Sequence, residues 1–358
     1  MNENINLHKA KKAKADEFYT QYADIETEMN AYIEYNKDVF KNKIILCPCD
    51  DPEWSNFTKY FAANFERLGL KQLISTSYAK SSGNKQISKF EKNSNKFNEE
   101  MHKTHGKVFI LDKDKNNSGK IDYEDIEFEY LQGDGDFRSD EVTKLRDKAD
   151  VIITNPPFSL FREFLAWIIE AEKEFVIIGN QNTITHKDIF PLIRDNKIWL
   201  GNGFKGNAGF FKSPYDDIAT AGEHREGLIR VPGVLWFTNI DHGKRHEPLQ
   251  LMTMEDNLKY NKKLKKKLEE NWGNIKYPHY DNYDAIEIPL YNAIPSDYNG
   301  IMAVPITFLY KHCPEQFEIV GCTYNYGIPK EWSSETKMNS LVEGKSVYKR
   351  LLIKKKGK

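Results

Sequence analysis

The sequence has 358 residues, of which 39% are hydrophobic and 29% charged, and its formal net charge is -1. This length allows one large α/β domain with a second lobe. No run approaches the roughly 18 consecutive apolar residues of a membrane span, and the N-terminus lacks an apolar signal segment, so a cytoplasmic protein without a membrane partner is expected. Four cysteines are too few for a disulfide framework and lack zinc-ligand spacing, so no metal site is predicted.

The first part of the chain predicts alternating helices and strands. Apolar residues at helical spacing predict an amphipathic helix around 25–33. A buried strand is predicted at 44–47, followed by a helix that Ser55 would cap and that would end near Gly69. A second buried strand is predicted within 71–79. This order is typical of parallel strands joined by a right-handed crossover.

The middle of the chain continues the pattern. Residues 80–106 are polar and lysine-rich, which favours a solvated insertion. Two strand-like stretches around the turn-rich "KNNSGK" predict a β-hairpin. "ADVIIT", "SLFREFLAWIIEAE" and "EFVIIGNQN" then predict strand, helix and strand. The expected fold class is α/β, a doubly wound, mostly parallel, Rossmann-like sheet over roughly 40–200.

The periodicity weakens after residue 205. "GLIRVPGVLWFTNI" is strand-like, and 259–270 predicts a lysine-rich helix. We therefore expect two parts, 1–204 and 205–358, with the last strands of the sheet falling within 205–240. The second part should be a mixed α+β lobe. It is the more basic of the two, as expected of a region that meets a polyanion.

Asn155-Pro156-Pro157-Phe158 directly follows a predicted buried strand. In an open α/β sheet, ligands bind beyond the carboxyl ends of the strands. The prolines fix φ and remove two backbone donors, so the Asn155 side-chain oxygen and the Pro156 carbonyl form two acceptors suited to an exocyclic amino group. Phe158 adds a flat surface for a planar base. Such fixed acceptors activate an aromatic amine without a strong base; the alternative interpretation is a structural turn.

This tetrad resembles the Asp/Asn/Ser-Pro-Pro-aromatic motif of amino-group DNA methyltransferases. Together with "DEFYTQYADIE", "CDDPEWSNF", "GDGDFRSDE" and "VPITFLYKHCPEQFEIVG", it makes the chain similar to the EcoRI-type adenine-specific subgroup over approximately 16–353. The resemblance implies S-adenosylmethionine as methyl donor and N6 of an adenine, flipped out of duplex DNA, as acceptor. It implies catalytic roles for Asn155, Pro156, Pro157 and Phe158.

The resemblance also implies a cofactor site, with Asn155 at its edge. Its matching positions near the methionine end are Phe18, Tyr19 and Thr20; those at the end of the first strand are Cys49, Asp50 and Asp51; those that read the cofactor's adenine are Asp136 and Phe137. The usual glycine-rich turn is missing after the first strand, and no acid ends the second, which leaves Ser75, Thr76 or Ser77 as ribose partners. The alternatives are core aromatics at 18–20 and an Asx-turn before Pro52.

Little chain separates Asp136 from Asn155, so the resemblance places target recognition in 205–358. Predicted nucleic-acid contacts are Lys205, Asn207, Lys262, Lys263 and Lys266. The segment 201–211 could clasp the flipped base or the DNA backbone, and the lysine run fits a solvated helix face equally well. A calcium loop at 112–125 is disfavoured, because the glycine and glutamate positions of an EF-hand are not filled.

Double-stranded DNA is the expected partner of a monomer or weak dimer, with a cognate restriction endonuclease in the same system and no direct contact implied. Three other methyl acceptors stay open: an RNA adenine, cytosine N4 and a protein glutamine. A non-catalytic DNA-binding relative is the alternative from a different class.

Overall fold

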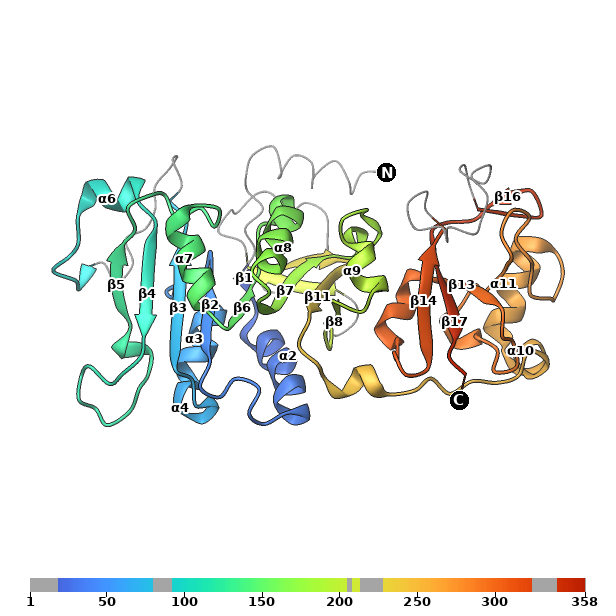
Figure 1. Ribbon diagram of the computed structural model, residues 1–358, viewed down its shortest axis with the longest axis horizontal. Helices are drawn as coiled ribbons and strands as arrows, with labels where there is room; N and C mark the ends of the chain where they lie inside the picture. Colours follow the sequence, from blue (N-terminus) through green and yellow to red (C-terminus); the bar gives the residue numbers. More distant parts are fainter. Residues whose placement is uncertain (1–18, 80–91, 205–207, 213–227, 324–339, 358) are drawn as a thin grey trace. The chain divides into compact units, whose positions relative to one another are not determined.

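The structure, a computed structural model, describes residues 19–79, 92–204, 208–212, 228–323 and 340–357 (Figure 1). The chain divides into two units. Unit 1 comprises Met1–Gln181 and Gly201–His242, and unit 2 comprises Asn182–Leu200 and Gly243–Lys358. The fold is mixed α/β with a large mixed sheet, which confirms the α/β prediction at this coarser level.

Unit 1 holds the following helices and strands: β1 (Tyr19–Thr20), α2 (Tyr22–Tyr35), β2 (Ile44–Cys47), α3 (Asn56–Ala63), α4 (Phe65–Leu68), β3 (Gln72–Ser77), α6 (Glu99–Thr104), β4 (Lys107–Leu111), η1 (Tyr123–Asp125), β5 (Glu127–Tyr130), α7 (Asp140–Lys148), β6 (Val151–Thr154), η2 (Phe158–Leu160), α8 (Phe161–Glu170), β7 (Glu174–Asn180), β9 (Ala208–Lys212), β10 (Ile229–Pro232) and β11 (Val234–Thr238). The 3-10 helix η3 (Gln181–Thr185) follows β7.

The strands of the large sheet in unit 1 lie in the order β5-β4-β3-β2-β6-β7-β11 (Figure 1). The pairs β2–β3, β2–β6 and β6–β7 are parallel. The pairs β3–β4, β4–β5 and β7–β11 are antiparallel. The expectation of a mostly parallel sheet is therefore wrong for its edges. The predicted hairpin, β4–β5, accounts for one edge, because the two strands of a hairpin are antiparallel.

The chain order reverses at β2. The strand β3 follows β2 through α3 and lies on one side of it, in the parallel register Ile45↔Leu73. The later strand β6 lies on the other side, in the register Leu46↔Ile152. The predicted strand-helix-strand unit is thus confirmed. The space beyond the carboxyl ends of β2 and β6 is a topological switch point, where open α/β sheets bind ligands.

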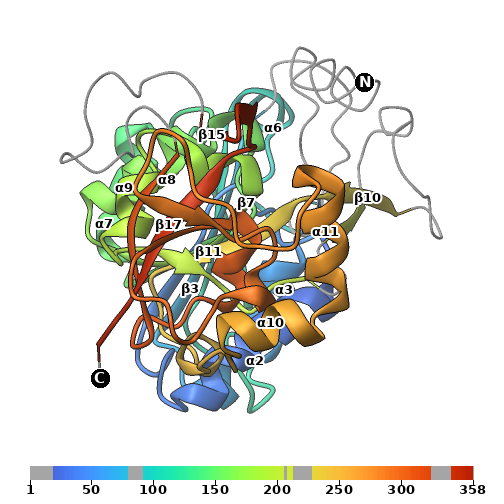
Figure 2. The same ribbon diagram turned by 90° about the vertical axis from the view of Figure 1, so that its right-hand side faces the viewer.

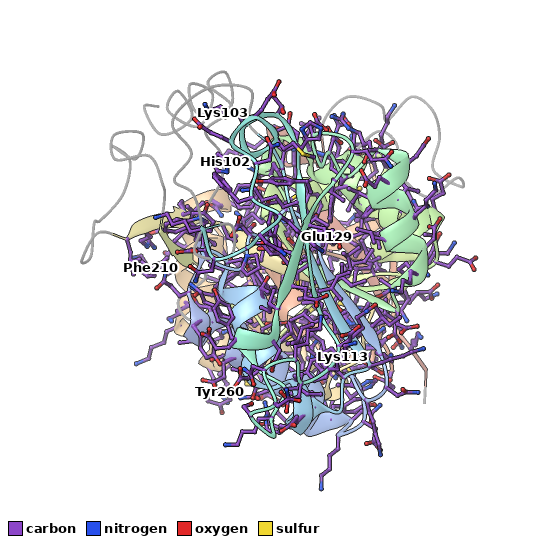
Figure 3. All side chains as sticks on the ribbon, turned by 90° about the vertical axis from the view of Figure 1, so that its left-hand side faces the viewer. His102, Lys103, Lys113, Glu129, Phe210 and Tyr260 are labelled. Carbon is purple, nitrogen blue, oxygen red and sulfur yellow. The ribbon has the colours of Figure 1, made fainter. Side chains whose placement is uncertain are left out.

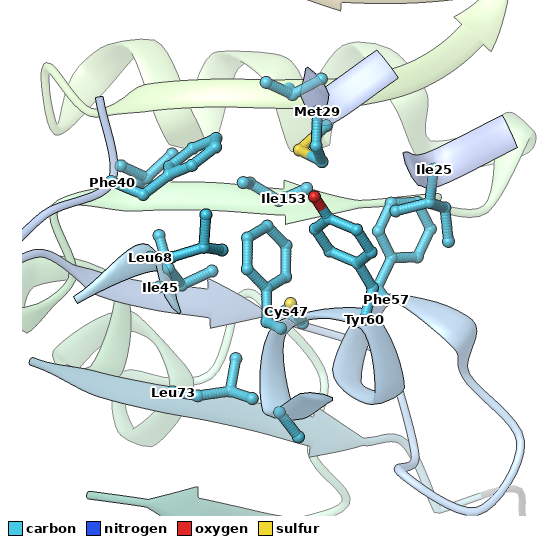
Figure 4. Packing of buried hydrophobic residues seen from close by; sticks show 14 of the residues in the cluster. Ile25, Met29, Phe40, Ile45, Cys47, Phe57, Tyr60, Leu68, Leu73 and Ile153 are labelled. Atoms are coloured by element: carbon cyan, nitrogen blue, oxygen red, sulfur yellow. The ribbon is translucent and has the colours of Figure 1, made fainter. Parts of the chain in front are cut away.

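Helices cover both faces of this sheet. On one face, α2 and α3 contribute Ile25, Met29 and Tyr60, which pack with Ile45 and Ile153 in one apolar cluster (Figure 4). All five are fully buried, and burying such a side chain stabilises the fold by about 1.5–3 kcal/mol.

On the other face, α8 approaches β7 at a glycine. A Cβ built on Gly179 would lie 2.4 Å from the Phe161 ring, so only glycine fits there without a shift.

A smaller antiparallel sheet, β1-β9-β10, belongs to the same unit. The stretch predicted to be strand-like after residue 227 forms two strands in two different sheets. β10 ends at Pro232 and β11 begins at Val234. Gly233 between them has φ +69°, a left-handed conformation that favours glycine and lets the chain change direction.

The outer strand β5 is lined with charges. Lys96 pairs with Glu129 at 2.6 Å, and Lys115 pairs with Glu127 at 2.8 Å. Figure 3 shows Glu129 and, at the other end of the hairpin, Lys113. Charged side chains along an outermost strand oppose the addition of a further strand.

Unit 2 holds the following helices and strands: α9 (Phe190–Arg194), β8 (Trp199–Leu200), η5 (Gly243–His246), α10 (Met254–Tyr260), α11 (Lys262–Trp272), β12 (Ala285–Glu287), η6 (Tyr291–Ala293), β13 (Ile301–Pro305), η7 (Ile306–Lys311), β14 (Phe317–Cys322), β15 (Leu341–Val342), β16 (Lys345–Ser346) and β17 (Arg350–Lys355). Its main sheet has the order β12-β13-β17-β14.

The predicted lysine-rich helix is α11, which follows α10 directly (Figure 2). The Asn261 side chain caps it by accepting from the Leu264 backbone N–H at 3.1 Å. Leu264 and Leu268 are fully buried, which explains why this highly charged segment is ordered as a helix. Within the described residues, no helix is long and apolar enough to cross a membrane.

Candidate functional site

The two strands at the switch point both end in proline-containing turns. β2 ends at Cys47, before Pro48, and β6 ends at Thr154, before Asn155. Proline has no N–H to donate to a sheet, so each strand stops there. Because β2 and β6 are parallel neighbours, their following segments lie at the same edge of the sheet. This places the predicted turn at 49–51 beside the predicted catalytic corner at 155–158.

Asp50 lies at the centre of this edge. Its side chain is 7% exposed. The Ser55 hydroxyl donates to its Oδ1 at 2.6 Å, and the Thr154 Oγ1 lies 2.5 Å from its Oδ2. The same Thr154 oxygen lies 2.7 Å from the Pro48 carbonyl oxygen. Asp50 therefore joins the end of β2 to the start of α3 and to the end of β6.

Burial raises the pKa of Asp50 to about 7, although the hydrogen bonds with Ser55 and Thr154 act in the opposite direction. Desolvation disfavours the ionised form of a carboxyl group. A carboxyl group with this pKa is protonated in the acidic range and loses its proton as the pH rises through about 7.

The turn itself has a strained backbone. Cys49 has φ +67°, the left-handed region where glycine is favoured, and its N–H donates to the Thr76 Oγ1 at 3.3 Å. The sequence lacks the glycine-rich turn usual at this position, and in the structure Cys49 takes the left-handed conformation that a glycine would adopt. Asp51 is half-buried and forms the Asx-turn named above as an alternative, since its Oδ1 accepts from the Glu53 N–H at 3.0 Å.

Tyr19 and Thr20 form β1, which pairs with β9. The Asn56 side chain donates to the Thr20 carbonyl at 2.7 Å, which holds β1 near the start of α3. Thr20 is 2% exposed, and its hydroxyl has no hydrogen-bond partner within the described part of the chain. A buried hydroxyl of this kind is suited to a bound polar ligand. Phe18 lies outside the described residues.

The segment that carries Asp136 packs against the end of β3. The Ala79 N–H donates to the Asp134 carbonyl at 2.6 Å. Gly135 has φ +81°, and a Cβ there would lie 2.4 Å from the Ser77 carbonyl oxygen. Only glycine permits this close approach. The segment is therefore fixed beside β3, the neighbour of β2.

Asp136 is bound by a neighbouring cation. Its carboxylate accepts from the Arg138 Nη2 at 2.7 Å and from the Nε at 2.9 Å, and Arg138 lowers the pKa of Asp136. The same guanidinium donates to Glu163 on α8 at 3.0 Å. Arg138 thus connects the predicted adenine-reading residue to the helix that follows the predicted catalytic corner.

Phe137 lies in the core. It is 3% exposed, and its ring centroid lies 5.0 Å from that of Phe164 and 5.6 Å from that of Trp167, both on α8. The sequence alone does not single out Tyr78, which follows β3, is 37% exposed and has a pKa raised by burial and by Asp134 and Asp136. Its place directly after a buried strand is the sequence feature that could have identified Tyr78 as a candidate site residue.

The three candidate ribose partners differ in position. Ser75 lies inside β3 and is fully buried, and Thr76 accepts the Cys49 N–H. Ser77 is the last residue of β3 and is 8% exposed. Of the three, Ser77 lies closest to the edge of the sheet where the other predicted residues gather.

The predicted catalytic corner passes directly from strand to helix. Pro157 precedes the 3-10 helix η2, and its carbonyl accepts from the Leu160 N–H at 2.9 Å. The chain then continues as α8. Asn155 is half-buried, and Phe158 packs partly against the apolar cluster between α2, α3 and the sheet. The two prolines therefore lie between the end of β6 and the start of η2, outside the hydrogen-bond ladder of the sheet.

The predicted nucleic-acid contacts fall into two groups. Lys205 and Asn207 lie outside the described residues. Lys262, Lys263 and Lys266 are exposed on α11 in unit 2, on the side opposite its buried leucines, and Lys266 lies 3.7 Å from Glu270. In unit 1, the loop before residue 205 is anchored by Glu28, whose carboxylate accepts from the N–H groups of Asn202 and Gly203.

No group of three or more His, Cys, Asp or Glu side chains is placed to hold a metal ion in the ranges that the structure describes. The loop at 112–125 uses its acids differently. The Asp125 carboxylate accepts from the N–H groups of Lys115 and Asn116, and the Asp114 carboxylate accepts from Gly119.

The sequence model of the family described as "Adenine-specific methyltransferase EcoRI" matches residues 6–356. The type II methyltransferase M.EcoRI of Escherichia coli is 43% identical over 357 residues, 98% of this chain and 96% of that protein. M.MpnI of Mycoplasma pneumoniae is 31% identical and M.MgeORF184P of Mycoplasma genitalium 33% identical, each over 98% of both chains. No solved structure matches the chain. These matches span nearly the whole sequence, and the chain belongs to the EcoRI family of adenine-specific methyltransferases.

Proposed function

We propose that this protein transfers a methyl group from S-adenosylmethionine to N6 of an adenine that is flipped out of duplex DNA. The observation that carries the proposal is the placement of Asn155-Pro156-Pro157-Phe158 beside the Cys49–Asp51 turn at the switch point, in a chain of this family. The order of the central parallel strands, β3-β2-β6-β7, supports a Rossmann-like use of the sheet.

The residues at this edge fit S-adenosylmethionine. The buried Thr20 hydroxyl, which has no partner among the described residues, and the left-handed Cys49 turn both suit a polar ligand. We assign Tyr19, Thr20, Cys49 and Asp51 to the methionine end. Asp136 and Tyr78 would hold the adenine end, and Phe137 would support them from the core.

The corner would bind and orient the target base. The Asn155 side-chain oxygen and the Pro156 carbonyl would accept from the two N–H groups of the exocyclic amine, and Phe158 would contact the face of the base. Fixed acceptors favour a pyramidal nitrogen with an available lone pair. S-adenosylmethionine supplies an electrophilic methyl group, so that a carbon–nitrogen bond forms, a carbon–sulfur bond breaks and one amino proton leaves to solvent.

We assign target recognition to the C-terminal part of the chain, with Lys262, Lys263 and Lys266 meeting phosphates. Exposure of all three on one helix supports this role. The protein would act on DNA as a monomer or weak dimer. It would belong to a system with a cognate restriction endonuclease that makes no direct contact with this protein.

The test is transfer of labelled methyl groups to DNA, RNA and a protein substrate, followed by identification of the modified base. We expect N6-methyladenine in DNA alone. Asn155→Ala should abolish transfer while cofactor binding stays within about twofold, because Asn155 faces the amine. Asn95→Ala, at an exposed asparagine of unit 1, is the control and should transfer normally.

Each alternative has its own outcome. Labelled methyl groups in RNA, in protein or at cytosine N4 would show that the methyl acceptor is not N6 of a DNA adenine. Cofactor binding without transfer to any acceptor would identify a non-catalytic relative. Normal transfer by Asn155→Ala would contradict the role of the amide.

A further inference from the structure

The hydroxyl group of Thr154 has one hydrogen and two close oxygen neighbours. The Pro48 carbonyl oxygen lies 2.7 Å away and the Asp50 Oδ2 lies 2.5 Å away. A carbonyl oxygen can only accept, and an ionised carboxylate can only accept. With Asp50 ionised, one of these two short contacts would join oxygen to oxygen with no hydrogen between them.

A protonated Asp50 removes this conflict. Its Oδ2–H donates to Thr154, and the Thr154 hydroxyl donates to Pro48. On the other side, the Ser55 hydroxyl donates to Oδ1 at 2.6 Å while its oxygen accepts the Phe57 N–H at 3.1 Å. Each hydrogen in this series of hydrogen bonds then has one acceptor, as buried polar groups require.

The burial of Asp50 opposes a negative charge and outweighs the hydrogen bonds with Ser55 and Thr154, which act in the opposite direction. The groups that face it are the Cys47 thiol from β2, the Ser55 hydroxyl at the N-cap of α3 and the Thr154 hydroxyl from β6, none of which carries a positive charge. The Cys47 thiol is neutral, because burial and the neighbouring Asp50 raise its pKa. No ion pair involves Asp50 within the described parts of the chain. A buried carboxylate without a cation is costly.

We propose that Asp50 is a positioning residue that works as a neutral acid, holding the Cys49–Asp51 turn against Thr154 and thereby fixing Asn155, and that it does not itself bind the ammonium group of the cofactor. Its position supports this inference, since Thr154 directly precedes Asn155 and Pro48-Cys49 directly precede Asp50. The raised pKa of Asp50 agrees with the hydrogen count. Among the two acids of the turn, this leaves Asp51 for the cofactor.

Ionisation of Asp50 would break the chain of hydrogen bonds. Thr154 could then donate to only one of its two neighbours, and the contact between the two strand ends would weaken. We therefore infer that methyl transfer declines as the pH rises above neutral. The effect on transfer depends on the proposed function, whereas the effect on folding does not.

The test compares Asp50→Asn with the wild-type protein. An asparagine in the same place can donate its N–H to Thr154 and accept from Ser55, as the protonated acid does, but it cannot ionise. In thermal unfolding without cofactor or DNA, the Tm of the wild type should fall relative to that of Asp50→Asn by about 5 °C or more from about pH 5 to about pH 8.5. Glu34→Gln, an exposed acid of α2, should keep the wild-type pH dependence.

Kinetics provide the second readout. Asp50→Asn should keep the KM for S-adenosylmethionine within about twofold and should retain its rate at alkaline pH better than the wild type does. Asp50→Ala and Thr154→Val should both lower kcat about tenfold or more, because each removes part of the chain of hydrogen bonds, and Thr154→Ser should restore it.

Two results would overturn the inference. One is an equal pH dependence of Tm in the wild type and Asp50→Asn. The other is a rise in the cofactor KM of about tenfold in Asp50→Asn with an unchanged Tm, which would show that an ionised carboxylate binds the cofactor. If the wild type transferred no methyl group at all, the proposed function would fail, and the unfolding comparison would still decide the state of Asp50.

Discussion

Arg138 holds the carboxylate of Asp136 with two hydrogen bonds, at 2.7 Å from Nη2 and 2.9 Å from Nε. These bonds orient the Asp136 carboxylate, which we propose accepts from the amino group of the cofactor's adenine. About half of the Arg138 side chain is exposed, so the pair should contribute little to stability. We expect the pair to affect the binding of S-adenosylmethionine instead.

Arg138→Ala should therefore raise the KM for S-adenosylmethionine about threefold to tenfold, because Asp136 loses its fixed orientation, and should change Tm by no more than a few degrees. Steady-state kinetics and thermal unfolding measure the two effects. Lys103→Ala removes a comparable exposed ion pair with Glu99 and serves as the control. An unchanged KM would show that the Asp136–Arg138 pair plays no part in cofactor binding.

The close approach at Gly135 leads to a second prediction. Gly135→Ala should destabilise the protein by about 2–4 kcal/mol, since it combines a left-handed backbone with a Cβ 2.4 Å from the Ser77 carbonyl. It should also weaken cofactor binding, because the segment before Asp136 must move. Denaturant unfolding and cofactor titration measure these changes.

Gly119→Ala is the matched control for this substitution. Gly119 has φ +82°, nearly that of Gly135, and no atom lies within 4 Å of a Cβ placed there. It should show only the backbone cost of about 1 kcal/mol. If the two variants unfolded alike, the contact between Gly135 and β3 would not matter.

The lysines of α11 should act through charge. Replacing Lys262, Lys263 and Lys266 by glutamine should weaken DNA binding and reduce the slope of log K against log salt by about 3, since each lysine would no longer neutralise a phosphate. Binding measured at several salt concentrations gives this slope. Because all three side chains are exposed, Tm should hardly change.

A second triple variant, with glutamine at Lys113, Lys120 and Lys144 in unit 1, makes the same change in net charge. The two triple variants should differ in salt slope. A common slope would mean that α11 contributes only to the overall charge of the protein.

His312 should make stability depend on acid pH. Burial lowers its pKa to about 4, while a hydrogen bond to the Phe317 carbonyl at 3.1 Å acts in the opposite direction. The unfolded chain binds a proton near pH 6.5 and the folded chain does not. Stability from this residue is thus complete above that pH and is lost as the pH falls towards 4, by up to about 3 kcal/mol.

Denaturant unfolding of the wild type and of His312→Gln across this range measures the difference. The variant should be less stable at neutral pH and should show a shallower decline in acid. Parallel curves for the two proteins would show that His312 titrates normally in the folded state.

Much of the local structure follows from the order of the residues. The apolar strand Ile44–Cys47, the helix capped by Ser55 and the hairpin of β4 and β5 all lie where periodicity and turn residues predict them. Apolar periodicity, a capping residue and turn residues within one short stretch each signal such an element, so the sequence is enough to predict it. The sequence likewise predicts that the tetrad at 155–158 forms a corner at the end of a strand. The motifs identify the family.

Long-range packing decided the rest. Antiparallel edges of the sheet, burial of Phe137 under α8, exposure of Tyr78 and the pairing of Asp136 with Arg138 all depend on which elements become neighbours. Asp50 and Asp51 are identical in type and adjacent in sequence, yet one is enclosed between Ser55 and Thr154 and the other lies half-buried in an Asx-turn. The two side chains differ in burial and in hydrogen-bond partners. Both differences depend on how β2 and β6 pair in the fold, which a local sequence pattern does not specify.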